Sequence, residues 1–193
     1  KNIKTMGYGA FGECTGLTEI EIPKTLEKVT TYHYGENNGA FRGCSNLKEV
    51  RFEEGTKKVA EYLFTNCPGL EKITIPEGIE TIGNGAFAGC GNLTDIIMPG
   101  SVTTIGNSAF ESTGKVKKIE IGRGTVTIAD NAFKNCNELE EVSLPDTIET
   151  IGVNAFQNDQ KITGLKLPKN IKTMGYGAFG ECTGLTEIEI PKT

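Results

Sequence analysis

The amino-acid sequence predicts an α/β repeat solenoid, in which short units stack on one another instead of folding around separate cores. Three observations lead to this prediction: an Ala-Phe pair that recurs at a fixed spacing, a short stretch of alternating apolar residues in each unit, and a proline that follows most of these stretches. A period of roughly 20–50 residues is typical of solenoids, because a unit of that size is too small to bury its own apolar face.

The Ala-Phe pair divides the chain into about eight units. With Leu63-Phe64 filling one gap, the pair recurs every 23 residues, except for a spacing of 30 between the first two pairs. Eight of the nine phenylalanines belong to this column, and the ninth, Phe52, takes a strand position. We therefore expect residues 1–193 to form one solenoid domain. The column consists of Ala10-Phe11, Ala40-Phe41, Leu63-Phe64, Ala86-Phe87, Ala109-Phe110, Ala132-Phe133, Ala155-Phe156 and Ala178-Phe179.

Each unit opens with a leading aliphatic residue and two alternating apolar positions, as in Leu70, Ile73 and Ile75. Alternation with a period of two predicts a short strand with one buried face. A proline such as Pro76 then ends the strand in most units, since its nitrogen has no hydrogen to give to a neighbouring strand. Stacked units should lie about 4.8 Å apart along the resulting sheet.

The residue pattern in the second half of each unit predicts a brief extended segment followed by one turn of helix. Two apolar residues three positions apart, such as Ile79 and Ile82, mark the extended segment, and a glycine often follows, where a positive φ is readily adopted. The residue before Ala-Phe is usually Gly, Ser or Asn, which favour helix N-caps. The residue before the cysteine column is mostly Gly or Asn, which favour helix C-termini. Only one short helical turn fits between these caps.

The combined pattern LxxIxIPxxIxxIGxxAFxxCxxL, as in Leu70 to Leu93, resembles the BspA-type leucine-rich repeat of bacterial surface proteins. The resemblance covers the whole chain, because the period and the Pro, Ala-Phe and Cys columns coincide. It implies a right-handed, curved leucine-rich-repeat solenoid with a parallel β-sheet on one side and short helical turns or extended segments elsewhere. It also implies exposure at a cell surface and a role in adhesion or protein recognition.

The two ends of the chain are duplicates. Residues 1–25 and 169–193 are the same string, whereas neighbouring units agree only at consensus positions. Natural gene duplication and deliberate design are alternative explanations of this identity. We expect natural duplication in a longer parent chain that repeats this block, so that Leu-Glu-Lys-Val-Thr-Thr-Tyr-His-Tyr would follow Thr193. Neither end carries a polar capping unit, which solenoids normally need. We therefore expect residues 1–193 to associate end to end or to fray at their termini.

The cysteines follow the repeat, and this favours a column of buried thiols. Disulfides are an alternative, because neighbours in the column would lie within the distance that a disulfide tolerates. A metal site is a weaker alternative, since the chain has no Cys-x-x-Cys pair and one histidine. We predict neither a metal nor a cofactor. The column comprises Cys14, Cys44, Cys67, Cys90, Cys136 and Cys182, with Thr113 and Asp159 in the two remaining units.

A seven-residue insertion near 32–38 is the part of the chain that the repeat does not explain. Tyrosine, histidine and asparagine are adaptable contact residues, and loops on a rigid scaffold frequently carry binding sites. A tolerated surface insertion with ordinary turn chemistry is the alternative. The candidate ligand contacts are Tyr32, His33, Tyr34, Glu36, Asn37 and Asn38.

The second candidate site is the open face of the predicted sheet. In many repeat proteins such a face binds the partner. Here it is mixed in charge with an acidic excess and has no aromatic anchor, so a solvated face is the alternative. A basic partner would be favoured, through contacts that weaken with salt. The candidate contacts are Glu49, Arg51, Lys72, Asp95, Lys118, Glu120, Glu141 and Lys166.

Composition argues against several functions. The net charge of −5 and the pI near 5.1 give no electrostatic basis for nucleic-acid binding. No apolar run reaches the roughly 18 residues that membrane insertion requires. No nucleophile–base pair, phosphate loop or metal cluster is visible, so no catalytic residue is predicted.

The predicted function is therefore a non-enzymatic protein-binding or adhesion module, extracellular and at the surface of a bacterial cell. Its expected partner is a protein, either of the host extracellular matrix or of another bacterial surface. The alternative function is a structural spacer or stalk that presents another domain.

Overall fold

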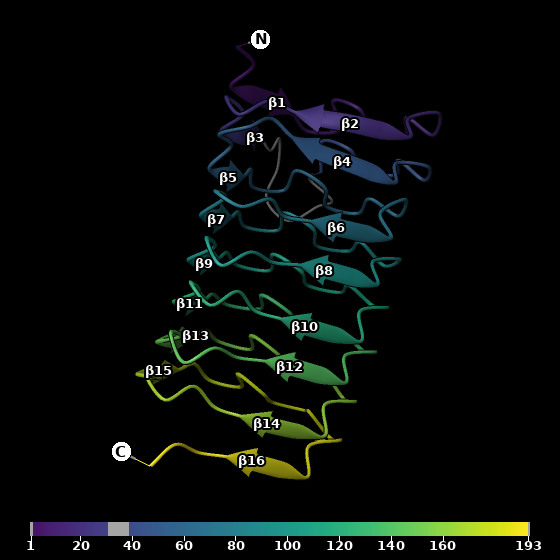
Figure 1. Ribbon diagram of the computed structural model, residues 1–193. Coiled ribbons are helices and arrows are strands. Elements are labelled where there is room, and N and C mark those ends of the chain that lie inside the picture. The colour runs from purple at the N-terminus through teal and green to yellow at the C-terminus, as the bar shows by residue number, and fades with distance from the viewer. Residues whose placement is uncertain (1, 31–38, 193) are drawn as a thin grey trace.

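The structure is a computed structural model that describes residues 2–30 and 39–192. These residues form a stack of coils, with the two ends of the chain at opposite ends of the stack (Figure 1). Each coil contributes one strand to each of two series that run along the stack. A parallel-strand β-solenoid is therefore confirmed, although the predicted single sheet is accompanied by a second one.

The first series lies on one side of Figure 1 and contains the longer strands. It comprises β2 (Glu19–Ile22), β4 (Glu49–Phe52), β6 (Lys72–Thr74), β8 (Asp95–Ile97), β10 (Lys118–Glu120), β12 (Glu141–Ser143), β14 (Gly164–Lys166) and β16 (Glu187–Glu189).

The second series is formed by the segments that carry the second apolar pair. It comprises β1 (Thr5–Gly7), β3 (Lys28–Thr30), β5 (Lys58–Val59), β7 (Thr81–Ile82), β9 (Thr104–Ile105), β11 (Thr127–Ile128), β13 (Thr150–Ile151) and β15 (Thr173–Met174). The brief extended segment predicted from the sequence is thus a strand in its own right.

The strand register follows the sequence repeat. Ile119 of β10 lies opposite Val142 of β12, one 23-residue period later, and the strands are parallel. Ile20 of β2 lies opposite Val50 of β4, 30 residues later. The longer spacing between the first two coils is therefore absorbed between β3 and β4, and the apolar residues stay in register.

At one junction between coils, hydrogen-bonded strand pairing is interrupted in both series at once. The short strands form the pair β1-β3 and the sheet β5 to β15, while the long strands form β2-β4, β6 to β12, and β14-β16. The junction between the β3/β4 coil and the β5/β6 coil therefore has no strand pairing among the described residues. It is held by a hydrogen bond from the Gly43 N–H to the Asn66 carbonyl at 2.9 Å, by the stacked rings of Phe41 and Phe64, and by turn contacts.

The predicted turn of helix is wrong: residues 2–30 and 39–192 contain no helix. Every second N–H in the Ala-Phe segment bonds to the next coil. Gly85, Phe87 and Gly89 each donate to a carbonyl of that coil at 2.8 Å, whereas Ala86 and Ala88 close turns within their own coil at 3.2 Å. A helix requires all of its N–H groups to bond along its own axis. In the stack, half of these N–H groups donate to the next coil, so the segment forms a series of turns. The α part of the predicted α/β class is therefore not supported.

The residues assigned to helix N-caps adopt left-handed backbone instead. The φ angles of Gly85, Ser108 and Asn131 are 59°, 53° and 57°. Asn66 and Asn135, ahead of the cysteine column, have φ angles of 54° and 62°. Gly and Asn tolerate this region because their side chains are absent or short and polar. The residue types were informative, but two left-handed positions flank the Ala-Phe pair where helix caps were expected.

The glycines after the second apolar pair have a different role from the one predicted. Gly83 and Gly106 do not have positive φ angles. A Cβ atom on Gly83 would lie 2.7 Å from the Glu61 nitrogen, and one on Gly106 would lie 2.8 Å from the Asn84 nitrogen. Glycine is therefore required here because neighbouring coils approach closely.

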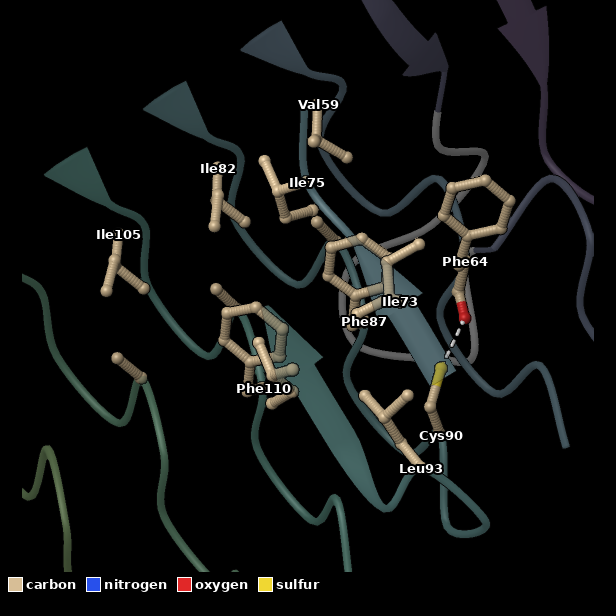
Figure 2. Packing of buried hydrophobic residues seen from close by; sticks show 14 of the residues in the cluster. Val59, Phe64, Ile73, Ile75, Ile82, Phe87, Cys90, Leu93, Ile105 and Phe110 are labelled. Atoms are coloured by element: carbon tan, nitrogen blue, oxygen red, sulfur yellow. Dashed lines mark hydrogen bonds between the residues drawn. The ribbon is translucent and has the colours of Figure 1, made fainter. Parts of the chain in front are cut away.

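The core contains a column of stacked phenylalanine rings. Consecutive rings from Phe11 to Phe179 have centroids 5.0–5.5 Å apart and nearly parallel planes. Figure 2 shows Phe64 and Phe87 in this column, beside the aliphatic residues of the short strands. The rings from Phe41 to Phe156 are completely buried. Each coil therefore covers the apolar face of its neighbour, as the repeat length predicts.

The cysteine column lies beside the rings. Five of the six thiols are buried, Cys14 is exposed, and all six are free. The Cys90 thiol donates to the Phe64 carbonyl at 3.1 Å (Figure 2), and burial raises the pKa of the Cys67 thiol to about 12. The arrangement matches the predicted column of buried thiols.

Two other residues occupy the cysteine position, and they differ in how well they fit. The Thr113 hydroxyl donates to the Phe110 carbonyl at 2.9 Å. Asp159 is completely buried, and its Oδ1 accepts the Cys136 N–H at 2.7 Å. Its Oδ2 has no hydrogen-bond partner among the described residues. Burial raises the pKa of the Asp159 carboxyl to about 9, against the lowering effect of the Cys136 hydrogen bond.

Candidate binding surface

The outward side chains of the long strands form a regular exposed surface, which we call the strand face. It arises because side chains alternate along a strand: in β6, Lys72 and Thr74 are exposed while Ile73 between them is buried. The 23-residue register stacks equivalent positions of successive coils into rows. All eight residues predicted for this surface lie on it and are exposed: Glu49, Arg51, Lys72, Asp95, Lys118, Glu120, Glu141 and Lys166.

A first cluster on the strand face surrounds Arg51 of β4. Its guanidinium lies 2.8 Å from a Glu49 carboxylate oxygen and 3.1 Å from a Glu19 carboxylate oxygen on β2. The hydrogen bond from Arg51 holds the pKa of Glu49 below its ordinary value. Two predicted contacts, Glu49 and Arg51, are thus brought together, and Glu19 joins them from the preceding coil.

A second cluster surrounds Lys118 of β10. The Lys118 ammonium lies 3.0 Å from a Glu120 carboxylate oxygen and 3.5 Å from a Glu141 carboxylate oxygen on β12. The hydrogen bond to Glu120 raises the pKa of Lys118, and the charge of Glu141 adds to this effect. Three predicted contacts therefore lie within one charged group that spans two coils.

A shallow hollow of about 230 Å³ lies beside the second cluster, lined by residues of β8 and β10. Asp95, Lys118 and Glu120 contribute charged groups to it, and Ile97 contributes an apolar side chain that is 48% exposed. Ile97 is not among the contacts predicted from the sequence. Its position at an outward site of the strand, where the other coils carry polar or small residues, is the signal that identifies it.

The ion pairs on the strand face are open to solvent, since the side chains of Arg51 and Lys118 are 60% and 53% exposed. Such pairs contribute little to stability. Their charges face outward and are available to a partner, and acidic side chains outnumber basic ones on this face.

The insertion candidates Tyr32, His33, Tyr34, Glu36, Asn37 and Asn38 lie outside the described residues. Their role as ligand contacts stays a prediction.

Within residues 2–30 and 39–192, no group of three or more His, Cys, Asp or Glu side chains is placed to hold a metal ion. The same part of the chain has no helix of the length and apolar character needed to cross a membrane.

One protein family matches nearly the whole chain. The family described as "BspA type Leucine rich repeat region (6 copies)" matches residues 4–139 and 109–193. None of the curated proteins matches the chain.

Several solved bacterial proteins have a similar fold. A leucine-rich repeat protein of T. pallidum is 24% identical, with a TM-score of 0.65 over 95% of this chain and 72% of its own. A leucine-rich repeat protein of Bacteroides ovatus is 23% identical, with a TM-score of 0.58 over 97% of this chain and 64% of its own. The pneumococcal vaccine antigen PcpA is 25% identical, with a TM-score of 0.55 over 96% of this chain and 53% of its own. The chain thus spans less than two thirds of the last two proteins.

Proposed function

We propose that this chain, which belongs to the BspA-type leucine-rich repeat family, is a non-enzymatic protein-binding or adhesion module of a bacterial cell-surface protein. The strand face is the observation that carries the proposal. It presents exposed side chains from successive coils in fixed register, on a scaffold whose apolar residues are used for stacking. A surface of this kind suits recognition of an extended protein partner.

An extracellular location at the bacterial surface is part of the proposal. It is supported by the family and by the similarity to PcpA, which is described as a pneumococcal vaccine antigen. The partner we propose is a protein of the host extracellular matrix or of another bacterial surface.

The chemistry of the strand face supports a partner with a basic surface and a small apolar side chain. The acidic excess would attract basic groups, and Ile97 offers an apolar contact between charged neighbours. Charged contacts guide association and weaken as salt is added. The binding constant is therefore expected to fall with ionic strength.

The test is a binding screen of the soluble protein against extracellular-matrix and bacterial surface proteins by surface plasmon resonance. The double variant Ile97→Ser/Glu120→Lys removes an apolar and an acidic contact from the hollow and the second cluster, and we expect it to weaken binding of a basic partner at least about tenfold. The matched control is Glu61→Lys, which makes the same charge change at an exposed position two residues after β5, on the side of the other strand series. Equal loss in both variants would argue against a site at the strand face.

A third variant that lacks residues 32–38 separates the two candidate sites. Binding lost by this variant and kept by Ile97→Ser/Glu120→Lys would place the site in the insertion. Binding by neither the original protein nor any variant would favour the alternative function.

That alternative is a structural spacer or stalk. It is supported by the position of the two ends of the chain at opposite ends of the stack (Figure 1) and by the lack of aromatic residues among the outward positions of the described long strands.

A further inference from the structure

One row of side chains on the strand face alternates in charge from coil to coil. It is formed by the first residue of each long strand from β4 to β12, and we call it the alternating row. The strand register places Lys72 beside Asp95, and Lys118 beside Glu141. All members of the row are exposed, and their charges are negative, positive, negative, positive and negative in the order Glu49, Lys72, Asp95, Lys118 and Glu141.

The spacing of the row selects among the conformations of an extended partner. Charges of one sign recur every second coil, and hydrogen-bonded strands lie about 4.8 Å apart, so the recurrence is about 9.6 Å. Side chains on one face of a β-strand recur about every 6.7 Å, and two turns of an α-helix rise about 10.8 Å. Every third residue of a polyproline II chain recurs after about 9.3 Å. Of these three conformations, polyproline II matches the row best.

The backbone beneath the row is already paired. Strands β6 to β12 form one sheet, so their N–H and C=O groups bond to neighbouring strands along the stack. A partner that crosses the face of these strands must therefore be held by side chains. A polyproline II chain suits this arrangement, because it has no internal hydrogen bonds, keeps its backbone in water and loses little entropy on binding.

Two neighbouring charges of the row are open to a partner. The Lys72 ammonium forms no ion pair with a described residue. The Asp95 carboxylate accepts a hydrogen bond from the Thr94 hydroxyl at 2.8 Å and likewise forms no ion pair with a described residue. A partner with an acidic group opposite Lys72 and a basic group opposite Asp95 would therefore break no ion pair at these two positions.

A less polar track lies beside these two charges. Thr74 of β6 and Ile97 of β8 stand next to each other in the register and point outward. Ile97 is 48% exposed and lines the hollow of about 230 Å³, together with Asp95 and Lys118. A proline ring laid over Ile97 would cover its exposed part, while charged residues next to that proline reach the alternating row.

We propose that the strand face binds a proline-rich segment of a partner protein, in the polyproline II conformation and laid along the stack across β4 to β12. Its charged residues recur every third position, with basic ones opposite Glu49, Asp95 and Glu141 and acidic ones opposite Lys72 and Lys118. Basic positions outnumber acidic ones, in agreement with the acidic excess of the face. The inference rests on the proposed function and adds the conformation and the charge period of the partner.

Two synthetic peptides test whether the charge period is read. One repeats Pro-Lys-Glu, and the other repeats Pro-Pro-Lys-Glu with the same number of lysines and glutamates. In the second peptide the charges recur after about 12.4 Å, out of step with the row. By surface plasmon resonance, we expect the first peptide to bind at least about fivefold more tightly. Equal binding of both peptides would overturn the proposal.

A charge exchange within the protein tests whether the row is the site. Lys72→Glu/Asp95→Lys leaves the net charge unchanged but breaks the alternation, so the Pro-Lys-Glu peptide should bind at least about fivefold more weakly. The matched control is Lys57→Glu/Glu80→Lys, which exchanges an exposed ion pair between neighbouring coils outside the strand face. Circular dichroism checks that both variants keep the fold. Equal weakening by both exchanges would also contradict the proposal.

Failure of this inference is distinguishable from failure of the proposed function. A protein partner that loses affinity for Ile97→Ser/Glu120→Lys, while neither peptide binds, would leave the strand face as a binding site and overturn the polyproline II segment. Absence of binding by every protein of the screen and by both peptides would overturn both proposals. Tighter binding of the Pro-Lys-Glu peptide that is lost in Lys72→Glu/Asp95→Lys and kept in the control would support both.

Discussion

Replacing Phe87 by alanine is expected to lower the free energy of unfolding by about 3–5 kcal/mol. The ring is completely buried, and its centroid lies 5.5 Å from that of Phe64 and 5.2 Å from that of Phe110. Removing it leaves a cavity that both neighbouring coils face, and the left-handed turns on each side restrict its collapse. Urea unfolding followed by circular dichroism measures the loss.

The control is Phe11→Ala in the first coil. Phe11 is 39% exposed and stacks on one described ring, that of Phe41, so its removal should cost less than half as much. If the two substitutions destabilise the protein equally, the stability does not come from coil-to-coil burial of the ring column.

Replacing Asp159 by threonine is expected to stabilise the protein at pH 7 by up to about 4 kcal/mol. Burial raises the pKa of this carboxyl to about 9, from an ordinary value of 3.8. Between these values the folded protein holds a proton that the unfolded chain has lost. Asp159 therefore destabilises the fold progressively as the pH rises from about 4 to about 9.

The neighbouring structure indicates that threonine fits at this position. The Thr113 hydroxyl bonds to the carbonyl three residues earlier, and a threonine at position 159 has the Phe156 carbonyl in the same place. The Cys136 N–H would lose Oδ1 of Asp159, but the equivalent Cys90 N–H bonds to the Phe87 carbonyl at 3.2 Å, so an alternative acceptor exists in the repeat.

The measurement is the free energy of unfolding of both proteins as a function of pH. The difference should be small near pH 4 and grow toward pH 9. Burial raises the pKa of the neighbouring thiols, that of Cys182 to about 11 and that of Cys136 further. Both proteins contain these thiols, so their own titration is common to the two curves. Thr113→Asp is the reverse control and should introduce the same pH dependence. A difference that does not change with pH would show that Asp159 is not held neutral by burial.

The repeat made the coil architecture predictable from the sequence. Alternation at Ile73 and Ile75, the proline after them, and the constant spacing of the Ala-Phe pair describe strands, their ends and their register. The prediction of a helical turn was wrong because Gly85 and Ser108 are residue types that suit both a helix cap and a left-handed turn. The choice between them depends on the next coil, which accepts the N–H groups.

Other features depend on contacts between coils and so could not be predicted from local patterns. The close approach at Gly83 is set by Glu61 in the preceding coil. The sequence shows that Asp159 stands where most units have cysteine. It does not show that Oδ2 of Asp159 is buried without a hydrogen-bond partner among the described residues. For the candidate site, alternation placed the charged residues on the exposed face, whereas the hollow at Ile97 needs the neighbouring strand β10.

The interrupted junction between the β3/β4 and β5/β6 coils has a mechanical consequence. The ends of the chain lie at opposite ends of the stack (Figure 1), so a pulling force applied through them crosses every junction in series. A series of junctions is only as strong as its weakest member, and this one has no strand pairing among the described residues. Rupture is governed by the rate at which that junction opens. Under load, the first two coils would separate from the remainder as a block, and the remaining coils would then carry the tension.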